Sequence, residues 1–264
     1  MKIYIINLPT EQSRASFQAS QFNRLKLDFE IVKAISVECV TQEFYESKAF
    51  SWERPLSYPE VACYLSHRNI WKKIIQTGDT ALILEDDAYV CNDLPELLEY
   101  FSKLKTEYIN LETRGRKKVL AERAKYQIKG YELKRLYYGG TGAAAYVLSP
   151  EGATKLLKME SQKGIALADA HICRTSCLKA WQIDSAAAIQ LDCCEYYDLK
   201  SPCETTSSLL GTRFSTKVPD RRKKSFKLRR LKAQLVLLGI KIVAIFKSAR
   251  QKEVLPKTSS FGIL

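Results

Sequence analysis

The chain has 264 residues, 46% of them hydrophobic, and a formal net charge of +13 at neutral pH. This length and apolar content are enough for one full-sized domain with a sizeable core. The excess charge is local, because residues 217–252 hold 13 Lys and Arg against one acid, Asp220, whereas the remainder holds 29 basic and 28 acidic residues. The body is therefore nearly neutral, which argues against a nucleic-acid-binding protein.

The eight cysteines have no regular spacing, and the first eight residues are too short an apolar run for a secretory signal. We therefore expect a reducing, cytosolic compartment and free thiols. A zinc site is the alternative for one group of these residues, although its spacing fits no standard template. Its candidate ligands are His171, Cys173, Cys177, Cys193 and Cys194.

The N-terminal part predicts a strand, helix, strand order. Residues 2–8 form an apolar strand, followed by a polar loop that runs into a helix carrying Arg14. Because this loop follows the carboxyl end of the strand, Arg14 could reach a bound phosphate or base; otherwise it is a solvated helix residue. Residues 29–35 form a second, shorter strand candidate.

A capping box begins the next helix. Ser57 can cap the helix, Glu60 can reach back, and Pro59 is tolerated in the first turn, so a helix to about residue 76 follows. His67 lies on its apolar face and points inward. Such a histidine is either a core residue or a group that contacts the ligand.

Three carboxylates then follow a strand that is apolar at every position, residues 81–84. This strand is typical of the centre of a parallel sheet, where ligands bind beyond the carboxyl ends of the strands. Alternation places Glu85 and Asp87 on one side and Asp86 on the other. Adjacent buried anions repel each other, and Mg²⁺ or Mn²⁺ would relieve that repulsion. The alternative is a solvated acidic turn.

The rest of the body is less strongly patterned. We expect a helix over 93–105, a short strand over 108–112, a glycine-rich turn over 137–142 and a strand over 143–148, with Ser149 capping a further helix. Residues 113–136 indicate either an acceptor-side loop or a solvated excursion. Asp169 precedes another short helix and is either its N-cap or a functional acid.

Taken together, these motifs resemble glycosyltransferase family 25, which includes the bacterial lipooligosaccharide and lipopolysaccharide galactosyltransferases. The resemblance spans roughly residues 2–175, and its strongest part is the Cys-x-Leu-Ser-His helix followed by the Leu-Glu-Asp-Asp strand. The matching pieces are Ile5-Ile6-Asn7-Leu8 with Arg14, Glu60-x-x-Cys63-x-Leu65-Ser66-His67-x-x-x-Trp71, Ala81 to Asp87, Gly140-Thr141, Tyr146-x-Leu148-Ser149 and Gly152-Ala153.

The resemblance implies a GT-A-like α/β fold with a mostly parallel central sheet flanked by helices. It also implies transfer of a hexose, galactose or a related sugar, with inversion from a UDP-sugar to a hydroxyl of a glycolipid or oligosaccharide acceptor. Asp87 is then the best ligand for Mn²⁺ or Mg²⁺, with Glu85 or Asp86 as the second, and Asp169 and His67 are the catalytic candidates. The expected donor-binding residues are Asn7, Arg14, Ser66, Asp86, Gly140 and Thr141.

The basic C-terminal part divides the chain into a catalytic domain, 1–212, and a tail, 213–264. The tail predicts a helix with one apolar stripe, and its apolar run is too short to span a bilayer. We expect it to lie on an anionic membrane surface through residues 217–252, on the cytoplasmic face of the inner membrane. Packing on the body or on a second subunit is the alternative. The stripe comprises Leu228, Leu231, Leu235, Leu238, Ile242 and Ile245.

Two other functions fit parts of the same pattern. A transferase-like scaffold could bind a sugar nucleotide without turning it over, and the basic tail could bind nucleic acid. The neutral body disfavours the second of these.

Overall fold

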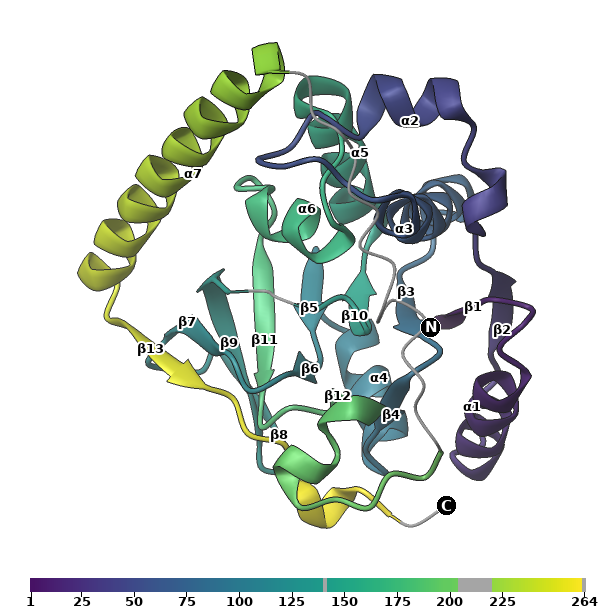
Figure 1. Cartoon of the computed structure of the whole chain (residues 1–264). Helices are drawn as coiled ribbons and strands as arrows, with labels where there is room; N and C mark the ends of the chain where they lie inside the picture. The colour runs from purple at the N-terminus through teal and green to yellow at the C-terminus, as the bar shows by residue number, and fades with distance from the viewer. Residues whose placement is uncertain (140–141, 204–219, 263–264) are drawn as a thin grey trace.

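The computed structural model describes residues 1–139, 142–203 and 220–262, and it has an α/β architecture (Figure 1). Ten of the described strands form one sheet in the order β13-β7-β9-β11-β5-β10-β3-β1-β2, with β8 paired to β9. The strands are β1 (Lys2–Asn7), β2 (Glu30–Lys33), β3 (Ala81–Glu85), β4 (Ala88–Val90), β5 (Tyr108–Asn110), β6 (Glu112–Thr113), β7 (Lys117–Ala121), β8 (Tyr126–Ile128), β9 (Tyr131–Tyr138), β10 (Ala145–Leu148), β11 (Ala180–Asp184), β12 (Ala188–Gln190) and β13 (Ala249–Glu253).

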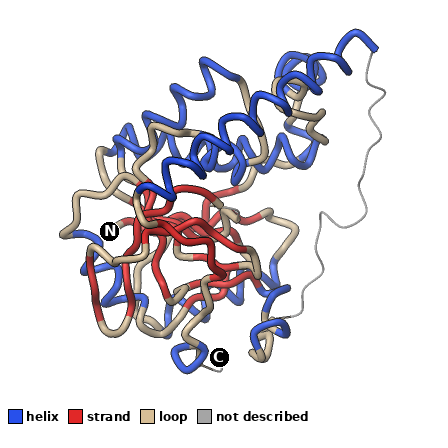
Figure 2. The backbone as a smooth tube through the Cα atoms, turned by 90° about the vertical axis from the view of Figure 1, so that its left-hand side faces the viewer, coloured by secondary structure: helices blue, strands red, loops and turns tan. Residues whose placement is uncertain are grey.

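Helices cover both faces of the sheet, and Figure 2 shows the strands at the centre with helices around them. The described α-helices are α1 (Gln12–Arg24), α2 (Gln42–Lys48), α3 (Tyr58–Thr77), α4 (Leu94–Ser102), α5 (Pro150–Lys163), α6 (Ala168–Arg174) and α7 (Asp220–Phe246). Alternate residues of β3 divide the core: Leu82 and Leu84 pack with α1 and α4, whereas Ala81 and Ile83 pack with α3 and α5.

The centre of the sheet is mostly parallel, as predicted. Strands β2, β1 and β3 run parallel, and β5 runs parallel to β11, while β10 is antiparallel between β3 and β5. Residues 81–84 are fully buried. The expected fold class is confirmed, and the carboxyl ends of β3 and β5 meet at the same edge of the sheet.

Local signals placed the helix boundaries well. Ser57 and Glu60 form the predicted capping box of α3, and Gly78 ends this helix with a positive φ of 73°. Ser149 caps α5 by accepting a hydrogen bond from Gly152. Asp169, in contrast, is not an N-cap, since Leu167 occupies that position of α6.

Residues 113–136 are strands rather than the loop or solvated excursion that their charged sequence suggested. They contribute β7, β8 and the start of β9, which extend the sheet beyond β11. The charged sequence hid the strand pattern of β7, in which even Lys118 is fully buried.

The C-terminal part returns to the body. Helix α7 is followed by β13, which pairs with β7, and the carbonyl of Val254 accepts a hydrogen bond from Thr113 Oγ1 at 2.5 Å. The expectation of a separate tail therefore does not hold for residues 249–261. None of the described helices combines the length and apolar character that a membrane crossing requires.

His171 is a buried histidine whose environment opposes protonation. Its Nε2 donates to the carbonyl of Leu156 at 3.0 Å, and its ring stacks on Trp71. Burial, with a further contribution from Arg174, lowers the pKa of His171 from 6.5 to about 4. This residue therefore supports the fold rather than a zinc site.

The lowered pKa of His171 predicts a pH-dependent stability. Between pH 6.5 and 4 the unfolded chain binds a proton here that the folded chain does not. Stability therefore falls as the pH falls, by on the order of 3 kcal/mol from this residue. Urea unfolding at several pH values should show the loss in the wild type and a weaker one in His171→Gln, which cannot titrate. Equal slopes in both proteins would contradict this assignment.

Candidate active site

Three consecutive carboxylates at the end of β3 point toward different partners. Glu85 contacts α3, Asp86 contacts the segment around α1, and Asp87 faces the interior with one carboxylate oxygen sealed from solvent. Asp86 and Asp87 lie in the turn after β3, so strand alternation does not extend to them.

Asp86 is held by two of the residues expected to bind the donor. Asn7 Nδ2 donates to its Oδ2 at 2.8 Å, and the guanidinium of Arg14 donates to its Oδ1 at 3.2 Å. Gln18 donates to the carbonyls of Asp86 and Ala88, both at 2.9 Å. These bonds fix the turn after β3, so Asp86 acts as an anchor and leaves Glu85 and Asp87 for a ligand.

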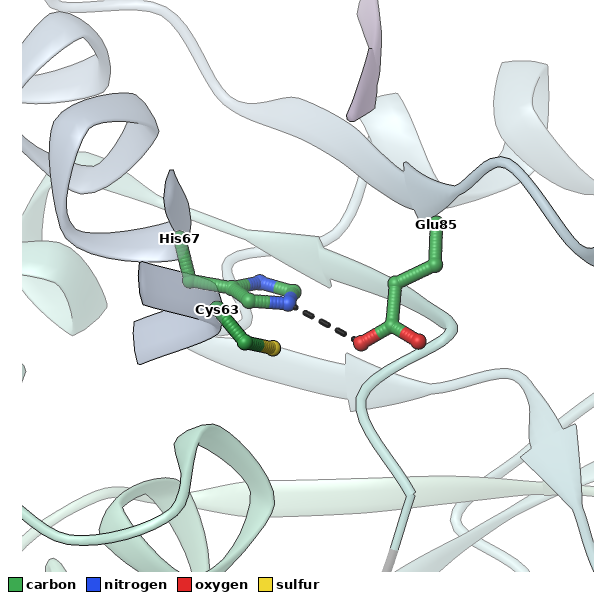
Figure 3. A group of neighbouring side chains, drawn as sticks. All are labelled: Cys63, His67 and Glu85. Carbon is green, nitrogen blue, oxygen red and sulfur yellow. Dashed lines mark hydrogen bonds and ion pairs between the residues drawn. The ribbon is translucent and has the colours of Figure 1, made fainter. Parts of the chain in front are cut away.

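A chain of hydrogen bonds fixes Glu85, and Figure 3 shows its last bond, between His67 and Glu85. The indole N–H of Trp71 can only donate, and it donates to the hydroxyl of Tyr146 at 2.9 Å. His67 Nδ1 lies 2.9 Å from that hydroxyl, and Nε2 lies 3.0 Å from Glu85 Oε1. Because an ionised carboxylate only accepts, Nε2 donates to Glu85, and Nδ1 of the neutral ring accepts from the hydroxyl. His67 is fully buried, as predicted, and it positions Glu85.

We expect Tyr146→Phe to break this chain. The change leaves the buried Trp71 N–H without its acceptor, which should cost about 2 kcal/mol of stability. Because His67 would lose its contact with the hydroxyl and hold Glu85 less firmly, turnover should also fall by on the order of 10-fold. Urea unfolding and turnover of this variant can be compared with Tyr100→Phe, whose side chain lies outside the chain of hydrogen bonds. Wild-type values in Tyr146→Phe would show that Glu85 needs no such support.

The surroundings of Asp87 and Glu112 disfavour their charged forms. Burial, then the charges of Glu85 and Asp86, raises the pKa of Asp87 to about 8. Burial and the charge of Glu85 raise the pKa of Glu112 similarly, to about 8. Asp87 Oδ1 and Glu112 Oε1 are both buried and have no hydrogen-bond partner among the described residues.

This donor set fits a hard divalent cation. Mg²⁺ and Mn²⁺ take carboxylate oxygens, and a cation beside these acids would relieve the repulsion among them. Glu112 is positioned for this by the backbone N–H of Ala144, which donates to Oε2 at 2.8 Å. Glu85, Asp87 and Glu112 are therefore the candidate ligands by their chemistry, although the described residues do not bring the donor atoms of all three within 4.8 Å of one another.

A second candidate ligand group is Cys63, His67 and Glu85, whose donor atoms lie within 4.8 Å of one another (Figure 3). Both ring nitrogens of His67 are already engaged in hydrogen bonds. Burial and the nearby charges of Glu85, Asp169 and Asp87 raise the pKa of the Cys63 thiol, so it stays protonated. This group is best explained as support for Glu85. The described residues do not bring the five expected zinc ligands together.

Asp169 lies near Glu112, on the other side of Gly142. Its Oδ2 accepts a bond from the backbone N–H of Gly142 at 3.4 Å, and its Oδ1 accepts one from Ala170 at 2.6 Å. A Cβ on Gly142 would lie 2.4 Å from the Glu112 carboxylate, which explains the glycine. Gly142 thus lies between Asp169 and the carboxylate of Glu112. The predicted donor contacts Gly140 and Thr141 lie outside the described residues.

Ser66 is engaged within the fold. Its hydroxyl accepts from the backbone N–H of Ile35 at 2.8 Å and donates to the carbonyl of Ala62 at 2.9 Å. These bonds hold α3 against the segment after β2, and the predicted donor contact of Ser66 finds no support in them.

Sequence reasoning missed Glu112, Lys118 and Gln190. Lys118 Nζ donates to the carbonyl of Glu112 and to Gln182, both at 2.6 Å, and burial lowers its pKa to about 8. Gln190 donates to Glu85 Oε2 at 3.5 Å. A signal existed for Glu112 alone, because it follows an apolar strand at its carboxyl end, as Glu85 does.

The mostly parallel sheet with acids beyond its central strand is the arrangement that the family resemblance led us to expect. The family model described as glycosyltransferase family 25 (LPS biosynthesis protein) matches residues 1–171. The chain belongs to this family.

Relatives from animals show the same membership. A Xenopus laevis procollagen galactosyltransferase 1-B is 27% identical over 175 residues, which cover 60% of this chain and 28% of the relative. An Aedes aegypti glycosyltransferase 25 family member is 25% identical over 189 residues, covering 64% and 30% of the two chains. The chain thus spans less than a third of the length of these relatives.

A structural neighbour is a glucose-1-phosphate thymidylyltransferase from Bacillus anthracis in complex with sucrose. It is 10% identical, covers 69% of this chain and 86% of its own, and has a TM-score of 0.38. A likeness of this size adds nothing about function.

Proposed function

We propose that this protein transfers galactose, or a related hexose, with inversion from a UDP-sugar to a hydroxyl group of a glycan acceptor. The observation that carries the proposal is the pair of orphaned, buried carboxylate oxygens of Asp87 and Glu112 at the edge of the sheet. Family membership supports sugar transfer, and the printed names of the animal relatives support galactose.

Asp87, Glu85 and Glu112 would hold a divalent cation. When bound, this cation supplies positive charge against the diphosphate of the donor, which stabilises the leaving group. The hydrogen bonds from His67 and Ala144 orient Glu85 and Glu112 before the donor arrives. A fixed carboxylate geometry of this kind avoids reorganisation during the reaction.

Asp169 is the proposed general base. Inversion requires a base that accepts the proton of the acceptor hydroxyl as it attacks the anomeric carbon from the face opposite UDP. Asp169 is partly exposed and lies beside Gly142, next to the acidic cluster but outside its buried part. Its carboxylate is therefore accessible to an acceptor.

A release assay tests the activity. UDP formation should be measured with a panel of UDP-sugars and simple glycoside acceptors, after chelation and after adding back Mn²⁺. We expect acceptor-dependent release with one donor, restored by Mn²⁺. A protein that binds UDP but releases none with any donor and acceptor is the scaffold of the alternative reading.

The proposal also includes binding of α7 to an anionic membrane surface that faces the cytosol. The six residues of the predicted stripe, led by Leu235 and Ile245, are all 46–72% exposed, although the helix is docked by Phe226 and Ala244. Arg230 and Lys241 are also exposed on α7. Arg221 to Lys224 lie outside the described side chains. An apolar stripe edged by cations suits an anionic membrane interface, where each cation contributes about 1 kcal/mol of binding free energy.

We expect acidic substitutions in the stripe to abolish this binding. Leu231→Glu combined with Leu238→Glu should reduce co-sedimentation with phosphatidylserine vesicles at least tenfold, because both charges would enter the interface. The matched control is Gln127→Glu with Gln251→Glu, which adds the same charge at exposed positions elsewhere. Equal sedimentation of the two variants would remove the stripe from the membrane.

A further inference from the structure

An open groove lies between α7 and the body. Its volume is about 370 Å³, and Val236, Gly239 and Val243 of α7 line one side of it. Val236 and Val243 remain 59% and 50% exposed although they face the body. A Cβ built on Gly239 would meet nothing within 4 Å. Protein atoms therefore do not fill the space beneath the helix.

The helix is held over this groove at both ends. Arg229 donates to the carbonyls of Phe50 and Trp52, both at 2.6 Å. Phe226 and Ala244 are buried, and β13 continues into the sheet beyond the helix. Because α7 is anchored on both sides, the groove is a defined feature of the fold.

The opposite wall of the groove is mostly apolar, with polar groups from Arg135, Thr175 and Ser176, and it adjoins the candidate active site. Leu136, Ile172 and Tyr108 are each at most 5% exposed. The ring of Tyr108 packs on Tyr146, with 5.5 Å between centroids, and Tyr146 belongs to the chain that positions Glu85. Helix α6 carries Ile172 on the groove and Asp169 in its first turn. A ligand in the groove is therefore close to the proposed base.

Cations bracket the groove. Lys232 lies four residues before Val236, and Lys247 lies four after Val243, so each shares the helix face that lines the groove. The turn continues as far as Lys247, whose N–H donates to the carbonyl of Val243 at 3.2 Å. Both lysines are exposed. Among the described lining residues only Arg135 is charged, and its guanidinium donates to the carbonyl of Ala180.

We propose that this groove binds one hydrocarbon chain of an anionic, lipid-linked acceptor, with its headgroup near the bracketing lysines. A hydrocarbon chain needs no hydrogen bonds from the apolar walls, whereas the backbone of a bound peptide would leave polar groups unpaired there. The groove lies within the usual size range of ligand pockets. This inference rests on the proposed function, which it deepens by naming the class of acceptor.

A filling substitution tests the groove. The probe is 11-(dansylamino)undecanoic acid, an anionic chain whose fluorescence rises in apolar surroundings. Gly239→Phe places a ring in the open space and removes a glycine from a helix, so it should not weaken the fold. We expect saturable binding by the wild type, at least tenfold weaker binding by Gly239→Phe, and wild-type affinity in Gln234→Phe, which adds the same ring at an exposed position of α7 outside the groove.

Two results would overturn the inference: no saturable binding by the wild type, or equal affinity in Gly239→Phe. A companion measurement of UDP binding with Mn²⁺ separates this failure from that of the proposed function. If UDP binds and the probe does not, only the groove assignment is wrong. If the probe binds as expected and UDP does not, the groove is supported and the donor site is wrong.

Discussion

Asp87→Asn should abolish sugar transfer without destabilising the protein. The substitution removes the carboxylate whose Oδ1 is buried without a partner among the described residues, and with it the proposed cation ligand. Loss of metal charge stabilisation worth several kcal/mol corresponds to a fall in turnover of on the order of 1000-fold. Stability should stay level or rise, because the variant relieves repulsion from Glu85 and Asp86.

The matched control is Asp79→Asn, at the opposite end of the same strand, where the side chain is exposed. It should retain wild-type turnover and wild-type stability. If Asp87→Asn unfolds at lower urea concentration and keeps normal, metal-dependent activity, then Asp87 is a structural residue.

The second large effect is expected at Asp169. Asp169→Asn keeps the shape and one of the two oxygens that accept hydrogen bonds from backbone N–H groups, but it is not a base. Turnover should fall by about 100- to 10,000-fold, the usual contribution of a general base, while UDP-sugar binding changes little.

Kinetics and calorimetric donor binding of Asp169→Asn distinguish catalysis from positioning. A change confined to turnover supports the base. If donor affinity or the unfolding midpoint falls instead, the bonds of Asp169 to Gly142 and Ala170 are its main contribution.

Much of the fold could be predicted because its signals are local. The apolar run of β3, the capping box at Ser57 and the inward face of α3 each follow from adjacent residues, and each is present. The prediction failed for the charged residues 113–136, because tertiary contacts there override the preference of charged side chains for solvent. Lys118 is a lysine inside a strand, and its burial becomes understandable only when Gln182 and the carbonyl of Glu112 surround it.

The site was predicted unevenly for the same reason. Glu85, Asp87 and His67 belong to continuous motifs, so sequence could group them. Glu112 comes from another strand, and only the pairing of β5, β10 and β3 brings it beside Glu85. The roles of Asn7 and Arg14 as partners of Asp86 also depend on contacts across more than 70 residues of chain.

Calorimetric titration of UDP into the full chain, with and without Mn²⁺, tests the central claim most directly. We expect UDP to bind at least tenfold more tightly when Mn²⁺ is present, and we expect Asp87→Asn to remove that difference. UDP binding of equal strength under both conditions, or an undiminished Mn²⁺ effect in folded Asp87→Asn, would contradict a donor site built on the carboxylates at the end of β3.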